Sequence, residues 1–462
     1  MNLGIGISSL VILSIIWGFL NLFSAKNASL ITSLKKSFSF VSAVFALLAL
    51  ELGGSMMLGT CEQAYSIGFL GILYVLGISL GFLLLGFGFA ARMRAMNVEN
   101  TIDLFQVKYK SPLLRLSASL LSTLTCGGLL IGQLVAAKSL VHALGIKSEI
   151  IFIMLCAFII MYAIMGGLKT AGITYSAQLI YCIIVFGGIF VYCMLADSPS
   201  FFEAPNLNTI PFDYSSLSFS GVFGSLVMPA LYYLTDQEFA KPLFGLTNKK
   251  EAALSAICAA IFMILFSLIP IYFGIKATQL PLSPNDCQSP LIPALKLLTN
   301  DWIVALAVIG IAGALIAMID YYLWAVTLGI TQELGLVYES VRNNSWYDKT
   351  MLIMVGIVAL CGSYCTTSSA IQVLLYSYEL YDSCLIVPLL MSYLQTEVKK
   401  GSAIGAFIAG LGSFILFRYC CLPLPQQLVS LLISLIGFYG GGWIEDCNKK
   451  IAAHKNSKTC SI

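Results

Sequence analysis

The sequence predicts an all-α membrane protein that crosses the bilayer many times. Hydrophobic residues make up 59% of its 462 residues and charged residues only 10%, whereas soluble domains contain about 25% charged residues. Apolar runs of about 20 residues, the length that a helix needs to cross a bilayer, recur along the whole chain. This composition excludes a soluble multidomain protein. The net charge of +3 is too small to indicate a nucleic-acid partner.

Thirteen apolar segments predict thirteen transmembrane helices, in chain order. They are residues 3–25, 37–60, 67–91, 113–137, 149–165, 173–196, 217–235, 252–275, 302–330, 351–366, 369–394, 402–417 and 425–444. The first segment has no basic residue before it, and its nearest lysine is Lys26, so we interpret it as a span and not as a signal peptide. No connection is long enough to hold a soluble domain, which disfavours a receptor or sensor.

The loop charges predict the orientation of the chain in the membrane. Of the 25 lysines and arginines, 20 fall on one face of the predicted topology and 5 on the other. Basic residues concentrate in cytoplasmic loops, so we expect an outside N-terminus and a cytoplasmic C-terminus in the cell (inner) membrane. The chain offers no metalloprotease or hydrolase motif, and its two histidines, His142 and His454, lie at a helix end and in the tail. An enzyme is therefore not expected.

Two of the predicted spans contain residues that interrupt a membrane helix. The second has Glu51 beside Gly53 and Gly54, and the seventh has Gly221, Gly224 and Pro229. Interrupted spans at corresponding positions of two halves point to the binding site of a secondary transporter; the alternative is that the glycines only allow close helix packing. The five-crossing spacing predicts two inverted repeats, and with them this division of the chain: a peripheral N-terminal helix and linker at 1–36, repeats at 37–196 and 197–394, two peripheral helices at 395–444 and a cytoplasmic tail at 445–462.

Acidic residues inside the predicted spans are candidate functional groups, because charges are costly in the membrane. Glu51 lies in the second span, Asp320 in the ninth, and Glu379 and Asp382 in the eleventh. No lysine or arginine lies at a depth that would pair with them. Buried carboxyl groups take up protons readily, so Glu51 and Asp320 are candidate carriers of a proton or ligands of an ion. Glu379 and Asp382 either line a route to the site or face water.

Three stretches resemble the sodium/solute symporter family. The first is the predicted cytoplasmic loop with Arg92, Arg94, Thr101-Ile102-Asp103-Leu104-Phe105, Lys108-Tyr109-Lys110-Ser111 and Leu114-Arg115. The second is the turn Tyr162-Ala163-Ile164-Met165-Gly166-Gly167-Leu168-Lys169-Thr170, and the third runs from Gly53-Gly54 through Leu58-Gly59 and Ala64-Tyr65 to Gly68. The resemblance extends over nearly the whole chain. It implies a LeuT-like inverted repeat of five plus five helices, with one further helix before it and two after it.

The resemblance also implies an ion site between the second and ninth spans. The family's backbone-carbonyl ligands of Na⁺ fall at Ala49, Leu52 and Ala314. Its two hydroxyl ligands fall at Ala317 and Met318, and a carboxylate near the ion exit falls at Tyr175. Sodium prefers oxygen ligands and methionine sulfur is a poor substitute. The transported cation is therefore left open between Na⁺, with Asp320 completing the site, and H⁺.

We predict a secondary active transporter, a solute:cation symporter for a small polar organic solute, without a cofactor. The solute is expected at the second and seventh spans, near Glu51, Gly53, Gly54, Ser55, Met56 and Tyr232. An acidic site without a basic partner favours cationic or zwitterionic solutes. The alternatives are a proton-coupled or uncoupled carrier, a channel, and a non-transporting membrane sensor or scaffold.

Overall fold

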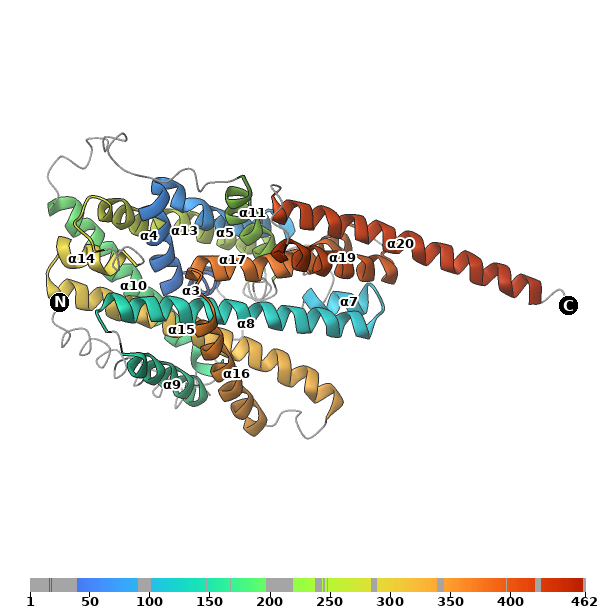
Figure 1. The fold of residues 1–462 in the computed structure, drawn as a ribbon, viewed down its shortest axis with the longest axis horizontal. Helices are drawn as coiled ribbons and strands as arrows, with labels where there is room; N and C mark the ends of the chain where they lie inside the picture. Colours follow the sequence, from blue (N-terminus) through green and yellow to red (C-terminus); the bar gives the residue numbers. More distant parts are fainter. Residues whose placement is uncertain are drawn as a thin grey trace.

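The computed structural model describes residues 16, 18, 40–89, 101–146, 148–166, 168–196, 219–236, 243, 246, 248–283, 289–338, 345–395, 397–419 and 425–459. Within these ranges the chain forms helices and no strand, as expected (Figure 1). The first predicted span, 3–25, falls outside the described residues apart from Ile16 and Gly18. Long apolar stretches leave a membrane chain no other way to satisfy its backbone than helices.

Ten helices of the described ranges are long and apolar enough to cross a membrane. The chain is therefore a multi-pass protein, although the predicted number of thirteen is not reproduced helix by helix. The spanning elements after the first break are α5 (Leu73–Leu84), α8 (Pro112–Ala143), α9 (Glu149–Gly166), α10 (Leu168–Ala196), α13 (Lys249–Ala277), α15 (Asp301–Val337), α16 (Ser345–Cys365), α17 (Ala370–Tyr381) with α18 (Val387–Leu394), α19 (Lys400–Tyr419) and α20 (Gln426–Thr459).

The second predicted span consists of two short helices, α3 (Phe40–Ala49) and α4 (Gly54–Ile67). The chain leaves helical geometry at Leu50–Gly53, where the sequence places its acid and glycine pair. The span is also longer than predicted, because α4 continues to Ile67 and is capped by Gly68. That residue has φ 65° and ψ −139°, a backbone conformation that only glycine adopts without strain, and it ends α4 before the short turn that leads into α5.

The seventh predicted span, residues 217–235, corresponds to α11 (Phe219–Thr235). The helix continues through Gly221, Gly224 and Pro229, so these three residues do not interrupt it, contrary to the prediction. It ends instead at Thr235, where Asp236 leaves the helix. Proline in a membrane helix is tolerated because neighbouring groups satisfy the freed carbonyl, and here its presence does not mark the break.

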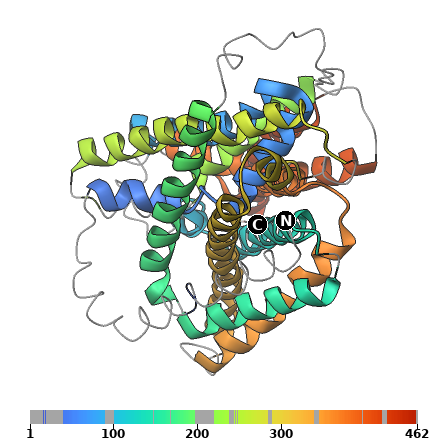
Figure 2. The same ribbon diagram turned by 90° about the vertical axis from the view of Figure 1, so that its left-hand side faces the viewer.

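The long helices α8 and α15 run side by side through the middle of the molecule, and the remaining helices pack around them (Figure 1). On one side α5 contacts α11 and α13, while α17 lies against α8. Figure 2 shows α9 and α16 together at the edge of the bundle, where they contact each other and α15. An additional short helix that we did not predict, α14 (Leu291–Leu298), precedes α15.

The last two helices, α19 and α20, are packed closely by glycines. A Cβ atom on Gly401 would lie 2.6 Å from the carbonyl oxygen of Gly441, and Gly405 and Gly437 face each other in the same way. Each helix thus presents a Gly-x-x-x-Gly pattern, which lets two membrane helices approach to backbone contact. Beyond this contact α20 extends away from the bundle towards the C-terminus (Figure 1).

Candidate functional site

The break between α3 and α4 holds a buried acid. The carbonyl oxygen of Leu48 accepts hydrogen bonds from the backbone nitrogens of Glu51, at 3.1 Å, and Leu52, at 2.8 Å, so the chain closes a tight turn there. Gly53 then adopts an extended conformation (φ −92°, ψ 168°) and caps α4. This turn leaves Glu51 only 5% exposed. Irregular backbone at this depth is stable only when protein or a water-filled cavity covers it.

Helix α15 covers the break, and the two glycines make this possible. A Cβ atom on Gly53 would lie 2.8 Å from Cγ of Met318. One on Gly54 would lie 2.8 Å from the carbonyl oxygen of Ile311 and would overlap Leu315. Both distances are shorter than the normal contact of about 3.5–4.0 Å. The glycine pair therefore brings the start of α4 directly against α15.

The predicted ion-binding positions come together between α3, α10 and α15. Ala49 and Ala317 pack in one apolar cluster with Tyr175 and Tyr321. Leu52, Ala314 and Met318 are buried too, and Met318 faces Gly53 in the break. The two positions where the family has hydroxyl ligands thus offer only a methyl group and a thioether, and hard cations bind such groups poorly.

Asp320 lies on α15, three residues after Ala317 of this cluster. The hydroxyl of Tyr175 donates a hydrogen bond of 2.9 Å to Oδ2 of Asp320, which links α10 to α15. The other carboxylate oxygen of Asp320, Oδ1, is buried and has no hydrogen-bond partner among the described residues. The family's carboxylate position on α10 is therefore a tyrosine here, and that tyrosine binds a carboxylate on the facing helix.

Five buried tyrosines from four helices surround the first break. This tyrosine cage consists of Tyr74 on α5, Tyr232 and Tyr233 on α11, Tyr322 on α15 and Tyr378 on α17. The hydroxyl of Tyr378 lies 3.2 Å from that of Tyr74 and 3.2 Å from that of Tyr233. Close helix packing sets this arrangement, because a Cβ atom on Gly81 of α5 would lie 2.7 Å from Cβ of Tyr233.

Glu51 faces the tyrosine cage. Tyr233 forms a hydrogen bond with its carboxylate, and Tyr74, Tyr322 and Tyr378 are close enough to interact with it electrostatically. The remaining oxygen, Oε1, is buried and has no hydrogen-bond partner among the described residues. Buried polar atoms are almost always paired, so an unpaired carboxylate oxygen at a helix break indicates a group that is to be bound there.

Asp236 is a site residue that the sequence reasoning missed. It follows the last residue of α11, is 4% exposed, and interacts electrostatically with Glu51 and Tyr232. An acid therefore follows the end of each of the helices α3 and α11, and the two acids interact with each other. The sequence contains Thr235-Asp236-Gln237-Glu238, a polar run that ends the apolar stretch. The proline and glycines before it were the stronger indication of a break.

The other predicted residues are distributed around this region. Tyr232 belongs to the tyrosine cage, while Ser55 and Met56 are buried in the first turn of α4. Glu379 and Asp382 do not face water, since they are only 5% and 0% exposed. Sequence reasoning missed Tyr74, Tyr322 and Tyr378, because single tyrosines in apolar helices carry no signal of which partner they will meet.

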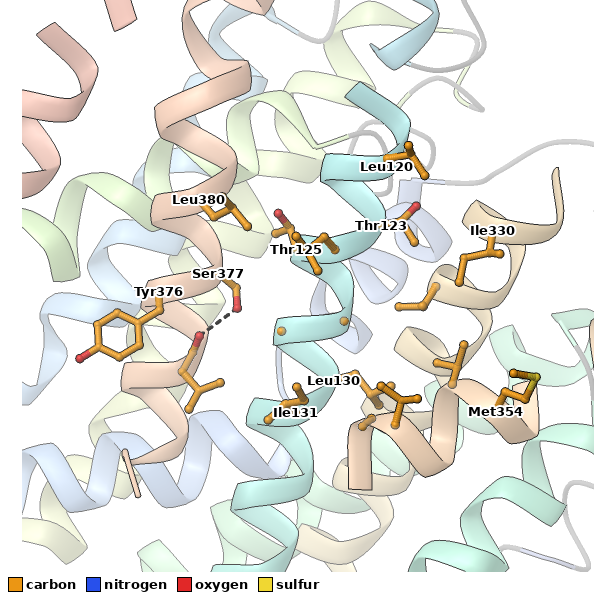
Figure 3. A pocket seen from close by; sticks show the side chains of 18 of the residues that line it. Leu120, Thr123, Thr125, Leu130, Ile131, Ile330, Met354, Tyr376, Ser377 and Leu380 are labelled. Carbon is orange, nitrogen blue, oxygen red and sulfur yellow. Dashed lines mark hydrogen bonds between the residues drawn. The ribbon is translucent and has the colours of Figure 1, made fainter. Parts of the chain in front are cut away.

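A cavity of about 690 Å³ lies elsewhere, between α8, α15, α16 and α17 (Figure 3). Gly127 leaves open space beside α8, and the surrounding side chains are mainly aliphatic, such as Leu130, Ile330 and Met354. The hydroxyl of Ser377 donates to the Val373 carbonyl at 2.9 Å, within its own helix. The cavity offers no charged group, so it suits apolar chains better than a polar solute.

Residues 35–206 match the family model described as "SSF: Sodium:solute symporter family". The family resemblance is confirmed over this stretch. The matched stretch includes both the break at Glu51 and the motif around Arg115, and the match supports a membrane transporter of small solutes.

Two solved structures are similar to the chain over most of its length. One, "Substrate-bound outward-open state of a Na+-coupled sialic acid symporter reveals a novel Na+-site", aligns with a TM-score of 0.72 and 15% identity, covering 95% of this chain and 97% of the other. The second is Mhp1, a nucleobase-cation-symport-1 family transporter in a closed conformation with bromovinylhydantoin bound, with a TM-score of 0.54 and 14% identity over 88% of this chain and 92% of the other. At these identities they show a LeuT-like transporter fold and nothing of the solute.

Proposed function

We propose that the protein is a secondary active transporter that moves a small polar organic solute across the cell membrane by alternating access. The observation that supports it most is the break at Glu51, where a buried carboxylate oxygen without a hydrogen-bond partner lies at a discontinuous helix. Discontinuous helices near the bilayer midplane are where secondary transporters bind substrate and ion. In this proposal the solute lies beside Glu51, Gly53, Gly54 and Tyr232.

The division of the chain belongs to the same proposal. Residues 37–196 and 197–394 form the two inverted repeats, 1–36 and 395–444 are peripheral, and 445–462 is a cytoplasmic tail. The helices α3 and α11 support it, because each is a short apolar helix that a buried acid follows within two residues. In this proposal the N-terminus lies outside and the C-terminus in the cytoplasm, as the loop charges predict.

We assign the coupling role to Asp320, with a proton as the cation. The predicted sodium positions, Ala317 and Met318, supply no side-chain oxygen. Asp320 has one oxygen bound to Tyr175 and a second, Oδ1, without a partner among the described residues, which leaves one atom to receive a proton. A proton needs only this one group, whereas sodium needs several oxygen ligands arranged around it.

Uptake into proteoliposomes tests the transport function. Purified protein is reconstituted, and uptake of a panel of labelled metabolites is measured with an imposed gradient, followed by counterflow for each solute taken up. Saturable uptake with counterflow supports a carrier. Flux without saturation or counterflow indicates a channel, and folded protein that moves no solute indicates a sensor or scaffold; either result would overturn the proposal.

Ion replacement tests the coupling role separately. Uptake is compared in sodium and in potassium, with and without an inward proton gradient. Proton coupling predicts accumulation in potassium that Asp320→Asn abolishes while downhill exchange persists. The Tyr175→Phe variant keeps the carboxylate and should shift the pH profile without abolishing accumulation. Strict sodium dependence would contradict proton coupling and favour a modified sodium site, which the double variant Ala317→Ser, Met318→Ser should strengthen.

A further inference from the structure

We propose that Glu51 and the tyrosine cage bind the ammonium group of an organic cation. This inference names the solute class of the proposed transporter and so rests on the proposed function. The site is made of one unpaired carboxylate oxygen and five aromatic rings from four different helices, all buried. Aromatic rings around a carboxylate are the arrangement that recognises substituted ammonium ions.

One acid follows the C-terminal end of α3 and another follows that of α11, where each helix already carries a partial negative charge. Helix α3 ends at Ala49 and is followed by Glu51, and α11 ends at Thr235 and is followed by Asp236. The C-terminal end of a helix carries a partial negative charge, so cations are favourable there and acids are unfavourable. Two acids that meet at two helix C-termini repel each other as well. A bound cation would relieve both sources of repulsion at once.

The rings of the cage provide the second half of an ammonium site. Tyr232 and Tyr378 lie with ring centroids 4.6 Å apart and planes at 34°, and Tyr232 meets Tyr233 edge to face at 5.6 Å and 82°. Their hydroxyls are occupied partly with each other, as the 3.2 Å contacts of Tyr378 show. The electron-rich faces of such rings attract a cation.

The surroundings disfavour the other common solute classes. No lysine or arginine in the described ranges forms an ion pair with Glu51; Arg115 and Lys138, for example, pair with Asp103 and Glu149 instead. An anionic solute would therefore meet two acids with no compensating base. A sugar needs many directed hydrogen bonds, whereas most of the cage surface is ring carbon. An inorganic cation would use the single free oxygen and leave the rings without a role.

Binding to matched ligands tests the inference directly. The full-length protein in lipid nanodiscs is titrated by calorimetry with choline and with dimethylbutanol, its uncharged carbon isostere, and with ethanolamine as a smaller ammonium compound. We expect at least one ammonium compound to bind about tenfold or more tightly than the isostere. Glu51→Gln should weaken that binding by a similar factor.

Substitutions in the rings separate aromatic recognition from simple packing. Tyr232→Phe keeps the ring and should retain ammonium binding, whereas Tyr232→Leu should lose it. Tyr192→Leu, on the exposed face of α10, and Asp348→Asn, near the start of α16, are controls and should bind as the wild type does. Circular dichroism and thermal unfolding establish that each variant is folded.

Three results would overturn the inference: equal affinity for choline and its isostere, no ammonium binding at millimolar concentrations, or ammonium binding unaffected by Glu51→Gln. Failure here is distinguishable from failure of the proposed function. Saturable uptake of a neutral or anionic solute would keep the transporter and remove the ammonium site. Ammonium binding without any flux would keep the site and remove the transporter.

Discussion

Replacing Gly54 by alanine should damage the protein even though the change adds one methyl group. The new Cβ atom would lie 2.8 Å from the carbonyl oxygen of Ile311 and would overlap Cγ of Leu315. Backbone cannot rotate away as a side chain can, so α4 must move from α15 by a substantial part of an ångström to restore a contact of about 3.5 Å. Overpacking of this kind costs about 1–3 kcal/mol.

The same substitution at Gly188 serves as the matched control. Gly188 lies inside α10, and a Cβ atom there would have no neighbour within 4 Å. Glycine is less favourable than alanine in a helix interior by about 0.8–1.0 kcal/mol, so Gly188→Ala should leave stability unchanged or raise it. One chemical change is thus expected to act in opposite directions at the two positions.

Thermal unfolding of the purified variants, followed by tryptophan fluorescence, measures the difference. Gly54→Ala should lower the midpoint and reduce uptake in proteoliposomes, because the moved α4 displaces Glu51 from the tyrosine cage. Gly188→Ala should do neither. The reasoning is refuted if Gly54→Ala unfolds at the wild-type temperature and transports normally, or if the two variants are equally destabilised.

Three further predictions concern parts of the structure away from the site. Gly405→Leu should separate α19 from α20 and lower thermal stability, because Gly405 touches the backbone of Gly437; Gly412→Leu, with no atom within 4 Å of its Cβ position, should not, and equal effects would contradict close glycine packing. Arg115→Met should destabilise by about 1–3 kcal/mol, since Arg115 bonds to Asp103 at 2.8 Å and to Glu333 at 3.0 Å; a second change, Glu333→Gln, should recover part of the loss in a denaturation experiment. Tyr109→Phe should lose about 0.5–1.5 kcal/mol by removing the 2.7 Å bond to the Pro388 carbonyl, and unchanged stability would show that this bond contributes nothing.

The sequence by itself determined the helical membrane class, the position of most spans and the first helix break. Apolar runs of bilayer length become helices in lipid, so α9, α13 and α19 begin and end within three residues of their predicted limits. Glu51 beside Gly53 and Gly54 marked the interruption correctly, because a charged residue is costly in a continuous membrane helix and glycine lets the backbone leave helical geometry. Each family motif is a run of residues close to one another in the chain, so it could be recognised from the sequence alone.

Which residues face one another was decided only by the tertiary structure. The predicted break at Pro229 is absent, because α11 continues through the proline to Thr235, and the buried acid of this region is Asp236 just beyond the helix end. Tyr74, Tyr233 and Tyr378 are far apart in sequence, yet their hydroxyls form one chain of contacts. Asp320 likewise accepts a hydrogen bond from Tyr175, which is 145 residues away in the sequence. Periodicity and composition act along the chain, whereas a binding site is set by helix crossings and by the close approach that glycines permit between helices distant in sequence.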